Sequence, residues 1–595
     1  MTSLLNTTHK PYKLSTFKIK RMRKLFIISL SIFTINSAFS QETKKDTLKT
    51  EEILVVKPYS PKISDAFKVK SNPNIDTVAT IEKEKVTYSI FSIPVASTFT
   101  PSKGKAKGLK RAPKERLFEN YVSAGFGNFT SPLFEAYLHT GDPRYSDLGI
   151  FINHHSSEGG IKDLQLDDNF ADTRIDAFYK YFDKYYNWQI NAGVQRKLYN
   201  YYGTNVDFDE AILSSIDEKQ IYKNIYVGGN IEFKESFFKG ATAELMNFSD
   251  NYKSNEFRFK IAPKLEFPIS TELINAEFLV DLVKGKFKQN YVTTDDIKYS
   301  FLNLGVSPNF EVLRDNLTIN LGAKIYYSSD LDNKTNKFYA YPNVTASLKL
   351  IDDIFILVAG ATGDLVQNTY QNYTLLNPYV SPTLNVELTD KQYKAFAGAK
   401  GKLASNIGYN FNVSHTNEQN KPLFRQNPAN TDGTQNITQA YEAGNSFNVI
   451  YDNVKTLGFF GEITIDASKE FNFTGTVNYN NYTTENELEA WNLPEITATI
   501  SAEFQKNKWF AGAKLFYGGT TKDYVTPFEQ PAATGIIIKN DSYIDLNLNG
   551  GYIFSDRLTA FAKLNNALGE KYEPFVNYQV QPLQVLAGIT YKFDL

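Results

Sequence analysis

The sequence predicts an all-β protein: a single large antiparallel transmembrane β-barrel of about 22 strands, preceded by a short periplasmic or lumenal N-terminal segment. Three observations predict it. From about residue 117 to the end, apolar and polar residues alternate in one stretch after another. Many of these stretches run for about ten residues, the length of a tilted membrane-crossing strand. Tyr and Phe, with 38 and 45 residues, give the aromatic content that is typical of strands.

Residues 1–40 read as a misassigned start followed by a secretory signal peptide. From Met22 the chain runs MRKLFIISLSIFTINSAFSQ, with basic residues first, then an apolar run, then small residues before Gln41. This order predicts translation from Met22 and cleavage after Ser40. The alternative is a membrane anchor, but the apolar run is shorter than the roughly 20 residues that span a bilayer. We therefore expect an exported protein of a Gram-negative cell, and the lack of cysteine excludes a lipoprotein anchor.

Residues 41–115 form an extended N-terminal segment that is rich in Lys and poor in aromatic residues. Its end overlaps the stretch 102–116, SKGKAKGLKRAPKER, which holds seven Lys and Arg against one Glu. Such a run is typical of a solvated linker, and the alternative is contact with anionic lipid headgroups or an acidic partner. The most apolar part is YSIFSIPVASTFTP at 88–101, which we expect to contact the inner wall of the barrel.

Residues 116–595 are the predicted barrel. The last strand, VLAGITYKFDL, places Val585, Ile589 and Tyr591 on one face and Leu586 and Gly588 on the other. The same alternation is clear in five earlier stretches: 317–327, 407–413, 471–479, 496–504 and 544–552. A soluble sandwich also alternates, but it is built from domains of about 100 residues, and no boundary recurs at that interval. Because lipid offers no hydrogen bonds to an exposed strand edge, a sheet in the membrane must close on itself.

Turns and aromatic clusters support the barrel. Short connections at 183–187 and 351–354 alternate with long polar loops, which we expect to be extracellular, around 200–221, 288–298 and 416–443. Between 452 and 471 the pattern is ambiguous, because NVKT and ASKE are both short. Two aromatic clusters could form interfacial girdles, although strand propensity explains part of this signal. They are Tyr185, Tyr186 and Trp188, and Tyr199, Tyr201 and Tyr202.

The composition excludes several classes of chemistry. Cysteine is absent and the formal charge is −1, so we expect no disulfide and no nucleic-acid partner. We predict no catalytic residue, no cofactor and no metal site, and therefore no enzyme. His154 and His155 are adjacent and so lie on opposite faces of a strand, which is poor geometry for shared ligation. The acidic loop with Asp163, Asp167 and Asp168 lacks the spacing of a calcium loop, which favours a solvated loop. The other histidines are His9, His139 and His415.

The last hundred residues resemble the barrel of TonB-dependent outer-membrane receptors, particularly those of Bacteroidota. Three stretches carry the resemblance: WNLPEITATISAEF at 491–504, FAKLNNALGEKYE at 561–573 and LAGITYKF at 586–593. The last strand also resembles a barrel-assembly signal, formed by Gly588, Tyr591 and Phe593. The resemblance implies a receptor in the outer membrane whose partners are the membrane lipid and the barrel-assembly machinery.

Near the mature N-terminus, EEILVVK resembles the TonB box of this family. Its residues are Glu51, Glu52, Ile53, Leu54, Val55 and Val56. Binding to TonB, or to another periplasmic or outer-membrane protein, would add this backbone as a strand to the partner's sheet. The alternatives are a residual first strand or an ordinary tail. The chain departs from the family in one respect, because residues 41–115 are too few for its plug domain.

Two functions from different classes follow. The first is a TonB-dependent-receptor-like transporter for an unidentified nutrient or chelate, and the alternative is a plugless structural or assembly subunit of an outer-membrane complex. A barrel of this size leaves a lumen that side chains of the wall cannot fill. The N-terminal segment, inward-folded loops such as 416–443, or another protein must therefore close it.

Overall fold

The computed structural model describes residues 118–142, 144–204, 206–269, 272–437, 439–526, 528 and 535–594. The chain divides into two compact units, and all the described residues belong to the second, Lys110–Leu595. The predicted signal peptide, the N-terminal segment and the TonB-box-like stretch lie outside them. None of the helices in the described part of the chain is both long enough and apolar enough to span a membrane.

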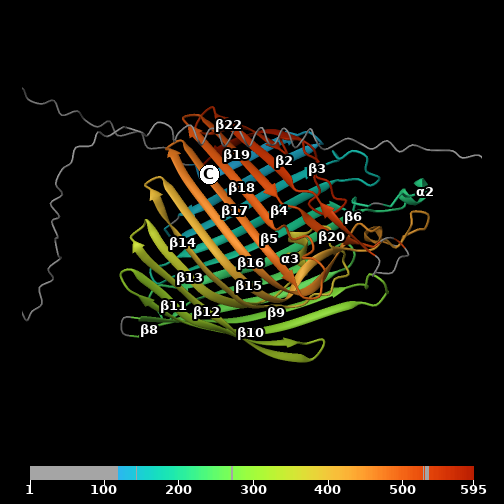
Figure 1. The fold of residues 1–595 in the computed structure, drawn as a ribbon. Helices are drawn as coiled ribbons and strands as arrows, with labels where there is room; N and C mark the ends of the chain where they lie inside the picture. Colours follow the sequence, from blue (N-terminus) through green and yellow to red (C-terminus); the bar gives the residue numbers. More distant parts are fainter. Residues whose placement is uncertain are drawn as a thin grey trace, which may run out of the picture. The chain divides into compact units, whose positions relative to one another are not determined.

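The described chain is a closed barrel of 22 antiparallel strands, as predicted (Figure 1). Each strand pairs with the next along the chain, except that β19 pairs with β22, and β24 pairs with β1 to close the ring. Closure gives every strand two neighbours, which satisfies the backbone in a solvent without hydrogen bonds. The first eleven strands are β1 (Asn120–Gly127), β2 (Ser131–Asp142), β3 (Ser146–Ser157), β4 (Phe170–Phe182), β5 (Tyr186–Asn200), β6 (Lys219–Phe233), β7 (Phe238–Ser249), β8 (Asn255–Ile269), β9 (Glu272–Phe287), β10 (Ile297–Leu313) and β11 (Leu317–Asp330).

The second half of the ring continues the same meander. Its strands are β12 (Thr335–Ile351), β13 (Phe355–Val366), β14 (Thr389–Ala404), β15 (Ile407–Gln426), β16 (Phe447–Ser468), β17 (Phe471–Thr484), β18 (Ile496–Lys506), β19 (Trp509–Gly518), β22 (Tyr543–Ile553), β23 (Leu558–Asn565) and β24 (Gln584–Phe593). A separate hairpin, β20 (Thr521–Val525) with β21 (Ile536–Asn540), lies in the connection between β19 and β22. The helices are short: α2 (Glu210–Leu213), α3 (Tyr370–Leu376) and the 3₁₀ turn η2 (Ala440–Glu442).

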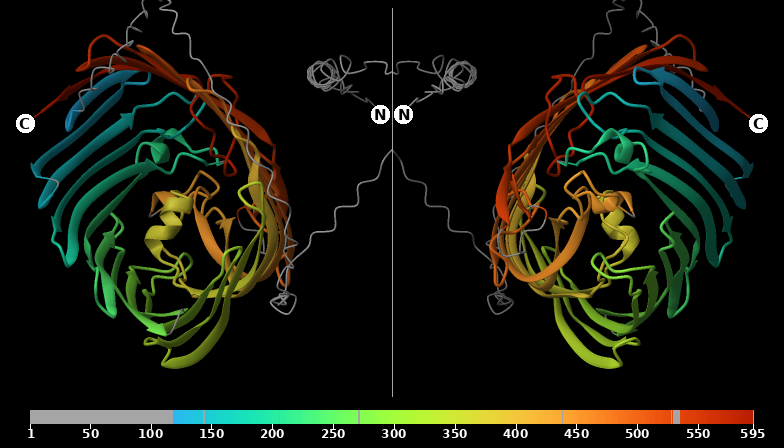
Figure 2. Two further views of the ribbon diagram at one scale, coloured as in Figure 1. Left: turned by 90° about the vertical axis from the view of Figure 1, so that its left-hand side faces the viewer. Right: turned by 90° about the vertical axis from the view of Figure 1, so that its right-hand side faces the viewer.

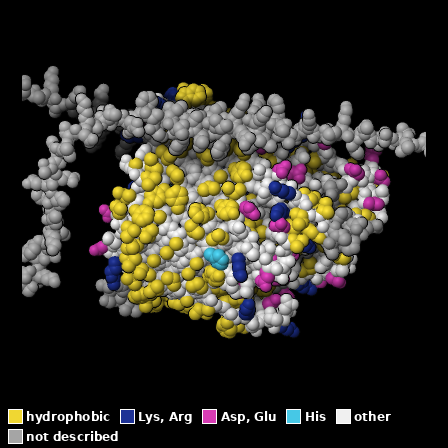
Figure 3. All heavy atoms as spheres, in the orientation of Figure 1, with side chains coloured by type: hydrophobic (Ala, Val, Ile, Leu, Met, Phe, Trp, Pro, Cys, Tyr) yellow, Lys and Arg dark blue, Asp and Glu magenta, His cyan; other side chains and the backbone are white. Residues whose placement is uncertain are grey.

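The apolar face of each strand forms the outer wall. In β24, Val585, Ile589 and Tyr591 are 42%, 56% and 45% exposed on the outside, whereas Leu586 on the other face is buried. Figure 3 shows hydrophobic side chains covering much of the outer wall that faces the viewer. Because these large apolar side chains have no protein cover, lipid is the solvent that their alternation matches. The prediction of a transmembrane barrel, rather than a stack of sandwiches, is confirmed.

The two ends of the barrel differ in their connections. At the short-turn end the strands are joined by segments such as 183–185, 405–406 and 507–508. At the other end, here called the loop end, most connections are long: 158–169, 201–218, 288–296, 367–388, 427–446, 485–495, 519–542 and 566–583. The alternation of short turns and long loops is therefore confirmed. Two details were wrong in the predicted positions.

Both corrections concern strands that are longer than a membrane needs. The predicted loop 416–443 begins too early, because β15 continues to Gln426 and pairs with the start of β16. The ambiguity between 452 and 471 has the same cause. NVKT lies inside β16, where Val454 and Thr456 pair with β17, and only ASKE contains a turn.

Aromatic side chains gather on the outer wall at the short-turn end. Tyr179 contacts Trp188 at 5.3 Å between ring centroids, and Trp509 contacts Tyr552 at 4.7 Å. Tyr185 is 56% exposed at the same end. Amphipathic rings at the end of an apolar wall match the headgroup level of a bilayer. The predicted girdle of Tyr185, Tyr186 and Trp188 thus lies where an interfacial girdle belongs.

The second predicted girdle was wrong. Tyr201 and Tyr202 are buried, and Tyr199 packs against the interior cluster that contains Tyr202. The reason is local: Tyr201 and Tyr202 follow the last residue of β5 and turn into the barrel with the loop. Their hydroxyls donate to the backbone oxygens of Val380 and Gln579, both at 2.8 Å. Aromatic content alone could not separate a lipid-facing ring from one that packs inside.

The long loops fold into the loop end of the lumen. Figure 2, which looks along the barrel, shows α3 inside the ring of strands. Around it lies a hydrophobic cluster, here called the loop-end core, formed by wall and loop side chains together. Its members include Tyr222, Phe248, Val283, Phe287, Tyr299, Tyr370, Tyr373, Val380, Leu384, Phe447, Val576 and Tyr578. Inward-folded loops, one of the three predicted ways of closing the lumen, are therefore present.

Candidate functional site

The segment 367–388 between β13 and β14, here called the lumen loop, carries α3. Thr369 caps this helix by accepting a hydrogen bond from the Asn372 backbone N–H at 3.1 Å. Tyr370, Tyr373 and Thr374 follow at the spacing of one helical face, and all three are buried. Leu375 and Leu376 are exposed. The helix is thus fixed to the barrel by its tyrosine face and leaves its other face to the lumen.

A buried carboxylate from the wall holds the start of α3. Glu256 on β8 is 0% exposed, and it accepts hydrogen bonds from the backbone N–H groups of Tyr370 (2.7 Å) and Gln371 (3.2 Å). It also accepts from the Tyr299 hydroxyl at 2.6 Å. A carboxylate at a helix N-terminus satisfies N–H groups that have no partner within the helix. Without Glu256 these donors would be left unpaired inside the loop-end core.

Tyrosine hydroxyls fix the rest of the lumen loop. Tyr370 donates to Asp250 at 2.8 Å, and Tyr222 donates to the Pro378 backbone oxygen at 2.8 Å. Tyr373 and Tyr451 share a hydrogen bond at 2.7 Å between their hydroxyls. Burial raises the pKa of Asp250, which lies between β7 and β8. Because each buried hydroxyl has a partner, the loop is part of the packed structure of the barrel.

Other loops at this end are anchored by single carboxylates. Asp452 accepts from the backbone N–H groups of Glu485, Asn486 and Glu487 at 2.9–3.1 Å, which fixes the start of the connection 485–495. Asp523 in the β20–β21 hairpin is 0% exposed and accepts from Asn492 Nδ2 at 2.8 Å. Burial raises the pKa of Asp523 to about 6.

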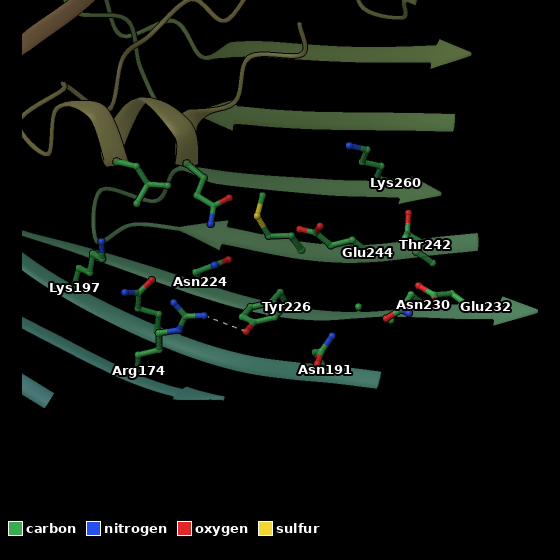
Figure 4. A pocket seen from close by; sticks show the side chains of 17 residues that line it. Arg174, Asn191, Lys197, Asn224, Tyr226, Asn230, Glu232, Thr242, Glu244 and Lys260 are labelled. Carbon is green, nitrogen blue, oxygen red and sulfur yellow. Dashed lines mark hydrogen bonds between the residues drawn. The ribbon is translucent and has the colours of Figure 1, made fainter. Parts of the chain in front are cut away.

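Beside the lumen loop, a cavity of about 700 Å³ runs along the inner wall of β4 to β8; we call it the lumen groove (Figure 4). Asn224 and Glu232 both line it, and they are separated by about 26 Å of extended strand. Its walls are mostly amide and charged side chains, and Gln371 and Leu375 of α3 close one side. The lining residues are Arg174, Asn191, Gln195, Lys197, Asn224, Tyr226, Gly228, Gly229, Asn230, Glu232, Thr242, Ala243, Glu244, Met246, Lys260, Gln371 and Leu375.

A second cavity, of about 620 Å³, continues along β7 to β13 and shares Lys260 with the lumen groove. Its charged side chains are largely paired with each other. The pairs are Lys239–Glu266 (2.8 Å), Arg258–Asp281 (2.6 Å), Lys264–Glu277 (3.3 Å) and Lys324–Asp364 (2.7 Å). The partly exposed pairs among them add little to stability, whereas Arg258–Asp281 is largely buried, and all four hold long side chains against the wall. The inner wall therefore offers polar surface to water over most of its length.

Of the predicted barrel-assembly residues, Gly588 lies at the seam between β24 and β1, and Tyr591 and Phe593 lie at the short-turn end. Gly588 pairs with Gly125 where β24 meets β1. A Cβ at Gly588 would stand 2.4 Å from the Ala124 oxygen and 2.5 Å from the Phe561 ring. Tyr591 and Phe593 stack at the short-turn end, with ring centroids 6.1 Å apart. Their role in assembly stays a prediction, as does that of Glu51–Val56, which lies outside the described residues.

The histidines and the acidic loop form no shared site. His154 contacts Thr173 at 2.8 Å, and His155 contacts Ser131 at 3.2 Å, so the two rings serve different neighbours. No group of His, Asp and Glu that could hold a metal was found among the described residues. Asp168 differs from the prediction of a solvated loop, because it is only 7% exposed and accepts from the Ile161 N–H at 3.1 Å. It stabilises the turn of its own loop.

Sequence reasoning missed the lumen loop, although one signal was present. Residues 367–388 interrupt the alternation between two clear strands, and they contain Thr369 followed by two tyrosines three residues apart. That spacing predicts a short amphipathic helix rather than a solvated loop. The partner carboxylate Glu256 could not be found this way, because it lies more than a hundred residues earlier in the chain.

Comparison with protein-family models and with curated protein sequences gives no match. Several solved structures share the fold. The ferripyoverdine receptor of the outer membrane of Pseudomonas aeruginosa, bound to ferripyoverdine, matches with a TM-score of 0.58 and 11% identity, over 81% of this chain and 73% of that chain. The FrpB iron transporter from Neisseria meningitidis (F3-3 variant) matches with a TM-score of 0.60 and 9% identity, over 81% and 82%. The ferric-catecholate import receptor Fiu from Escherichia coli K12 matches with a TM-score of 0.56 and 9% identity, over 81% and 82%.

These similarities show that the chain has the barrel fold found in outer-membrane receptors. Together with the lipid-facing wall, the fold supports an outer-membrane location. At this level of identity the comparison concerns the fold, and what each of those proteins binds is a property of that protein.

Proposed function

We propose that this chain is an outer-membrane receptor and transporter of the TonB-dependent type, which admits an unidentified nutrient or chelate. The observation that carries the proposal is the combination of the lumen loop with the lumen groove. The lumen loop narrows the barrel at the loop end, and the groove continues along the wall toward the short turns with amide and charged side chains. A hydrophilic solute would find hydrogen-bonding partners along this path. The proposal assigns no catalytic residue and no cofactor.

The proposal includes a contact with TonB through Glu51–Val56. An extended Val-rich segment can add a strand to the edge of a periplasmic partner, and its main-chain hydrogen bonds supply the affinity. The Bacteroidota type, the missing plug and cleavage after Ser40 belong to the same proposal. Assembly by the barrel-assembly machinery through Gly588, Tyr591 and Phe593 is its remaining part.

The test is uptake in the cell. A strain without the chain is grown on limiting iron chelates and on limiting carbon or nitrogen sources, and then complemented with the full chain or with variants. We expect one condition to require the full chain, and we expect deletion of 51–57 to abolish growth there. Deletion of 44–50, a control of equal length beside it, should preserve growth. If no condition requires the chain, or if both deletions behave alike, the proposal is wrong.

A second candidate is a structural or assembly subunit of an outer-membrane complex. The observation that favours it is the packed loop-end core, in which hydrogen bonds to Glu256 and Asp250 fix the lumen loop to the wall as part of the barrel. Purification of the full chain in mild detergent tests this alternative. A partner that remains in a fixed ratio, with no uptake defect in the deletion strain, would support assembly over transport.

A further inference from the structure

A row of side chains crosses the middle of the lumen groove. The pairing register places Asn191 on β5 opposite Gly228 on β6, Gly228 opposite Glu244 on β7, and Glu244 opposite Lys260 on β8. Figure 4 shows Glu244 and Lys260 on neighbouring strands at the cavity. Directly opposite residues on antiparallel strands have Cβ atoms about 5 Å apart. The Glu244 and Lys260 side chains therefore start from neighbouring positions on the wall, and Figure 4 shows the ammonium end of Lys260 pointing away from Glu244, so that the two charged groups are not in contact.

These two charges lie outside the close ion pairs of the wall, although Glu244 also interacts electrostatically with Arg258 on β8. Lys260 also lies opposite Asp281 on β9, but the Asp281 carboxylate accepts two hydrogen bonds from Arg258, at 2.9 and 2.6 Å. No ion pair within 4 Å joins Lys260 or Glu244 to another described residue, whereas the neighbouring Lys264 pairs with Glu277. Glu244 is exposed to the lumen and Lys260 is half-buried.

The floor beside Glu244 is open because Gly228 has no side chain. Its neighbour across β5 is Asn191, whose amide lines the same cavity. A Cβ at Gly228 would lie 3.2 Å from the Ala243 oxygen and 3.8 Å from Glu244. Space for the rest of a ligand held at Glu244 therefore exists above Gly228, between Asn191 and Glu244 and on the side of Glu244 away from Lys260.

We propose that Glu244 and Lys260 bind the zwitterionic head group of a ligand that carries an α-amino acid end. This inference rests on the proposed transport function and names its substrate class. In such a head group the ammonium nitrogen and the carboxylate carbon are joined through one carbon atom, so they stand about 2.5 Å apart. That separation suits two opposite charges on adjacent strands, with Glu244 receiving the ammonium group and Lys260 receiving the carboxylate. A peptide terminus supplies only one of these charges at each end.

The size and chemistry of the groove describe the rest of the ligand. A cavity of about 700 Å³ is several times larger than an amino acid head group, so the ligand extends along the wall. Asn224, Asn230 and Gln195 offer amides that both donate and accept hydrogen bonds. Tyr226 is the one aromatic residue among the lining side chains, and its hydroxyl donates to Asp176. A polar, amide-bearing tail fits this lining better than a sugar chain, which would need open aromatic rings.

The test uses γ-glutamylglycine, which keeps both charges on one carbon and has an amide tail. Two matched analogues each lack one charge: glutarylglycine has no ammonium group, and γ-aminobutyrylglycine has no α-carboxylate. Binding to the full chain in detergent is measured by titration calorimetry. We expect γ-glutamylglycine to bind at least about tenfold more tightly than either analogue, since each loses a charge-assisted hydrogen bond.

Two variants assign the charges. Glu244→Gln should remove the preference over glutarylglycine, and Lys260→Gln should remove the preference over γ-aminobutyrylglycine. Glu503→Gln and Lys514→Gln, on strands β18 and β19 across the barrel, are matched controls that should leave binding unchanged. Heat-modifiable migration on gels checks that each variant still forms the barrel.

The inference is overturned if glutarylglycine binds the full chain as tightly as γ-glutamylglycine, or if γ-glutamylglycine does not bind at its solubility limit. Equal loss in the control variants would also overturn it. The analogue comparison uses the unmodified chain, so it is decisive even where a variant fails to assemble. If the uptake test succeeds and γ-glutamylglycine does not bind, only the substrate class is wrong. If uptake never requires the chain, the proposed function itself fails.

Discussion

At the loop end the interior of the barrel is filled by packed side chains, whereas along the lumen groove it is open to solvent, although the same strands form both regions. On β8, Glu256 is fully buried and bonded to the lumen loop, while Lys260, four residues further along the same face, lines an open cavity. On β7 the change runs from Phe248, buried in the loop-end core, to the exposed Glu244. Alternation decides which side chains face the lumen. What covers them depends on loops that lie far away in the sequence.

The largest expected effect comes from a substitution at the seam between β24 and β1, because the loop-end core and the lumen groove both need a closed ring. Gly588→Val places a side chain against the Ala124 backbone and the Phe561 ring at the seam between β24 and β1. We expect the barrel to fail to close, so little folded protein reaches the outer membrane. Membrane fractionation with heat-modifiable migration measures this. Ala587→Val, the outward-facing neighbour, serves as the control, and equal loss in both variants would contradict the seam explanation.

Removing the lumen loop from the loop-end core should convert the barrel into a wider pore. Replacement of 369–386 by a short Gly-Ser linker deletes α3 and the tyrosines that pack in the loop-end core. We expect single-channel conductance in planar bilayers to rise well above that of the full chain, because a barrel of this strand number has a wide lumen. Unchanged conductance would show that residues other than the lumen loop set the narrowest point.

A smaller change should loosen the same end without deleting it. Glu256→Ala leaves the backbone N–H groups of Tyr370 and Gln371 without their acceptor, at a cost of about 1–3 kcal/mol for each buried group. We expect hydrogen exchange to accelerate in 367–388 and to stay unchanged in the strands at the short-turn end. Glu256→Gln keeps one acceptor oxygen and should show an intermediate rate. Uniform acceleration along the whole chain would argue against a local clamp.

The smallest expected effect is a pH dependence of the β20–β21 hairpin. The pKa of Asp523 is raised to about 6 in the folded chain, from 3.8 for a solvent-exposed Asp, because the carboxyl group is buried. Protonation therefore stabilises the fold: the contribution is full below pH 3.8 and is lost as the pH rises through about 6. Between pH 5 and pH 7 the difference is about 1 kcal/mol.

Hydrogen exchange in 521–525 and 536–540, corrected for the intrinsic rate, measures this difference. We expect stronger protection at pH 5 than at pH 7. In Asp523→Asn the difference should vanish, and a difference that persists would assign the titration to another group.

Much of the barrel could be predicted because its physics is local. The alternation in 317–327 and 496–504 predicts a strand and the residues on each of its two faces. Repeating this assignment along the chain predicts the number of strands, and each strand is expected to pair with the next. The strands β15 and β16 were read as too short, because Lys421 and Asp452 resemble loop residues. In fact they belong to strand ends that continue past the membrane. A polar residue indicates the end of a strand only where lipid covers the sheet. Beyond the membrane a strand can carry polar residues and continue.

The lumen loop and the groove could not be predicted for a different reason. Glu256 meets Tyr370 across more than a hundred residues, and Glu244 meets Lys260 only through the register of β7 and β8. Neither pairing leaves a trace in the spacing of residues along the chain. Tyr201 shows the same limit, since its position after β5 allowed both a girdle and a buried ring. Contacts of this kind, between residues far apart in the sequence, can be predicted only once the closed ring of strands is known.

The strands differ in length around the ring, and this difference affects which part of the barrel molecules outside the cell contact first. β16 spans 22 residues and β15 spans 20, whereas β1 has 8 and β2 has 12. At about 3.3 Å per residue and a tilt near 45°, β16 rises roughly 50 Å along the barrel axis, against about 30 Å of hydrocarbon. The flank formed by β15 and β16 therefore extends well beyond the bilayer, while the strands from β18 through the seam to β3 are much shorter. We expect antibodies and phage to contact the tall flank of β15 and β16 first.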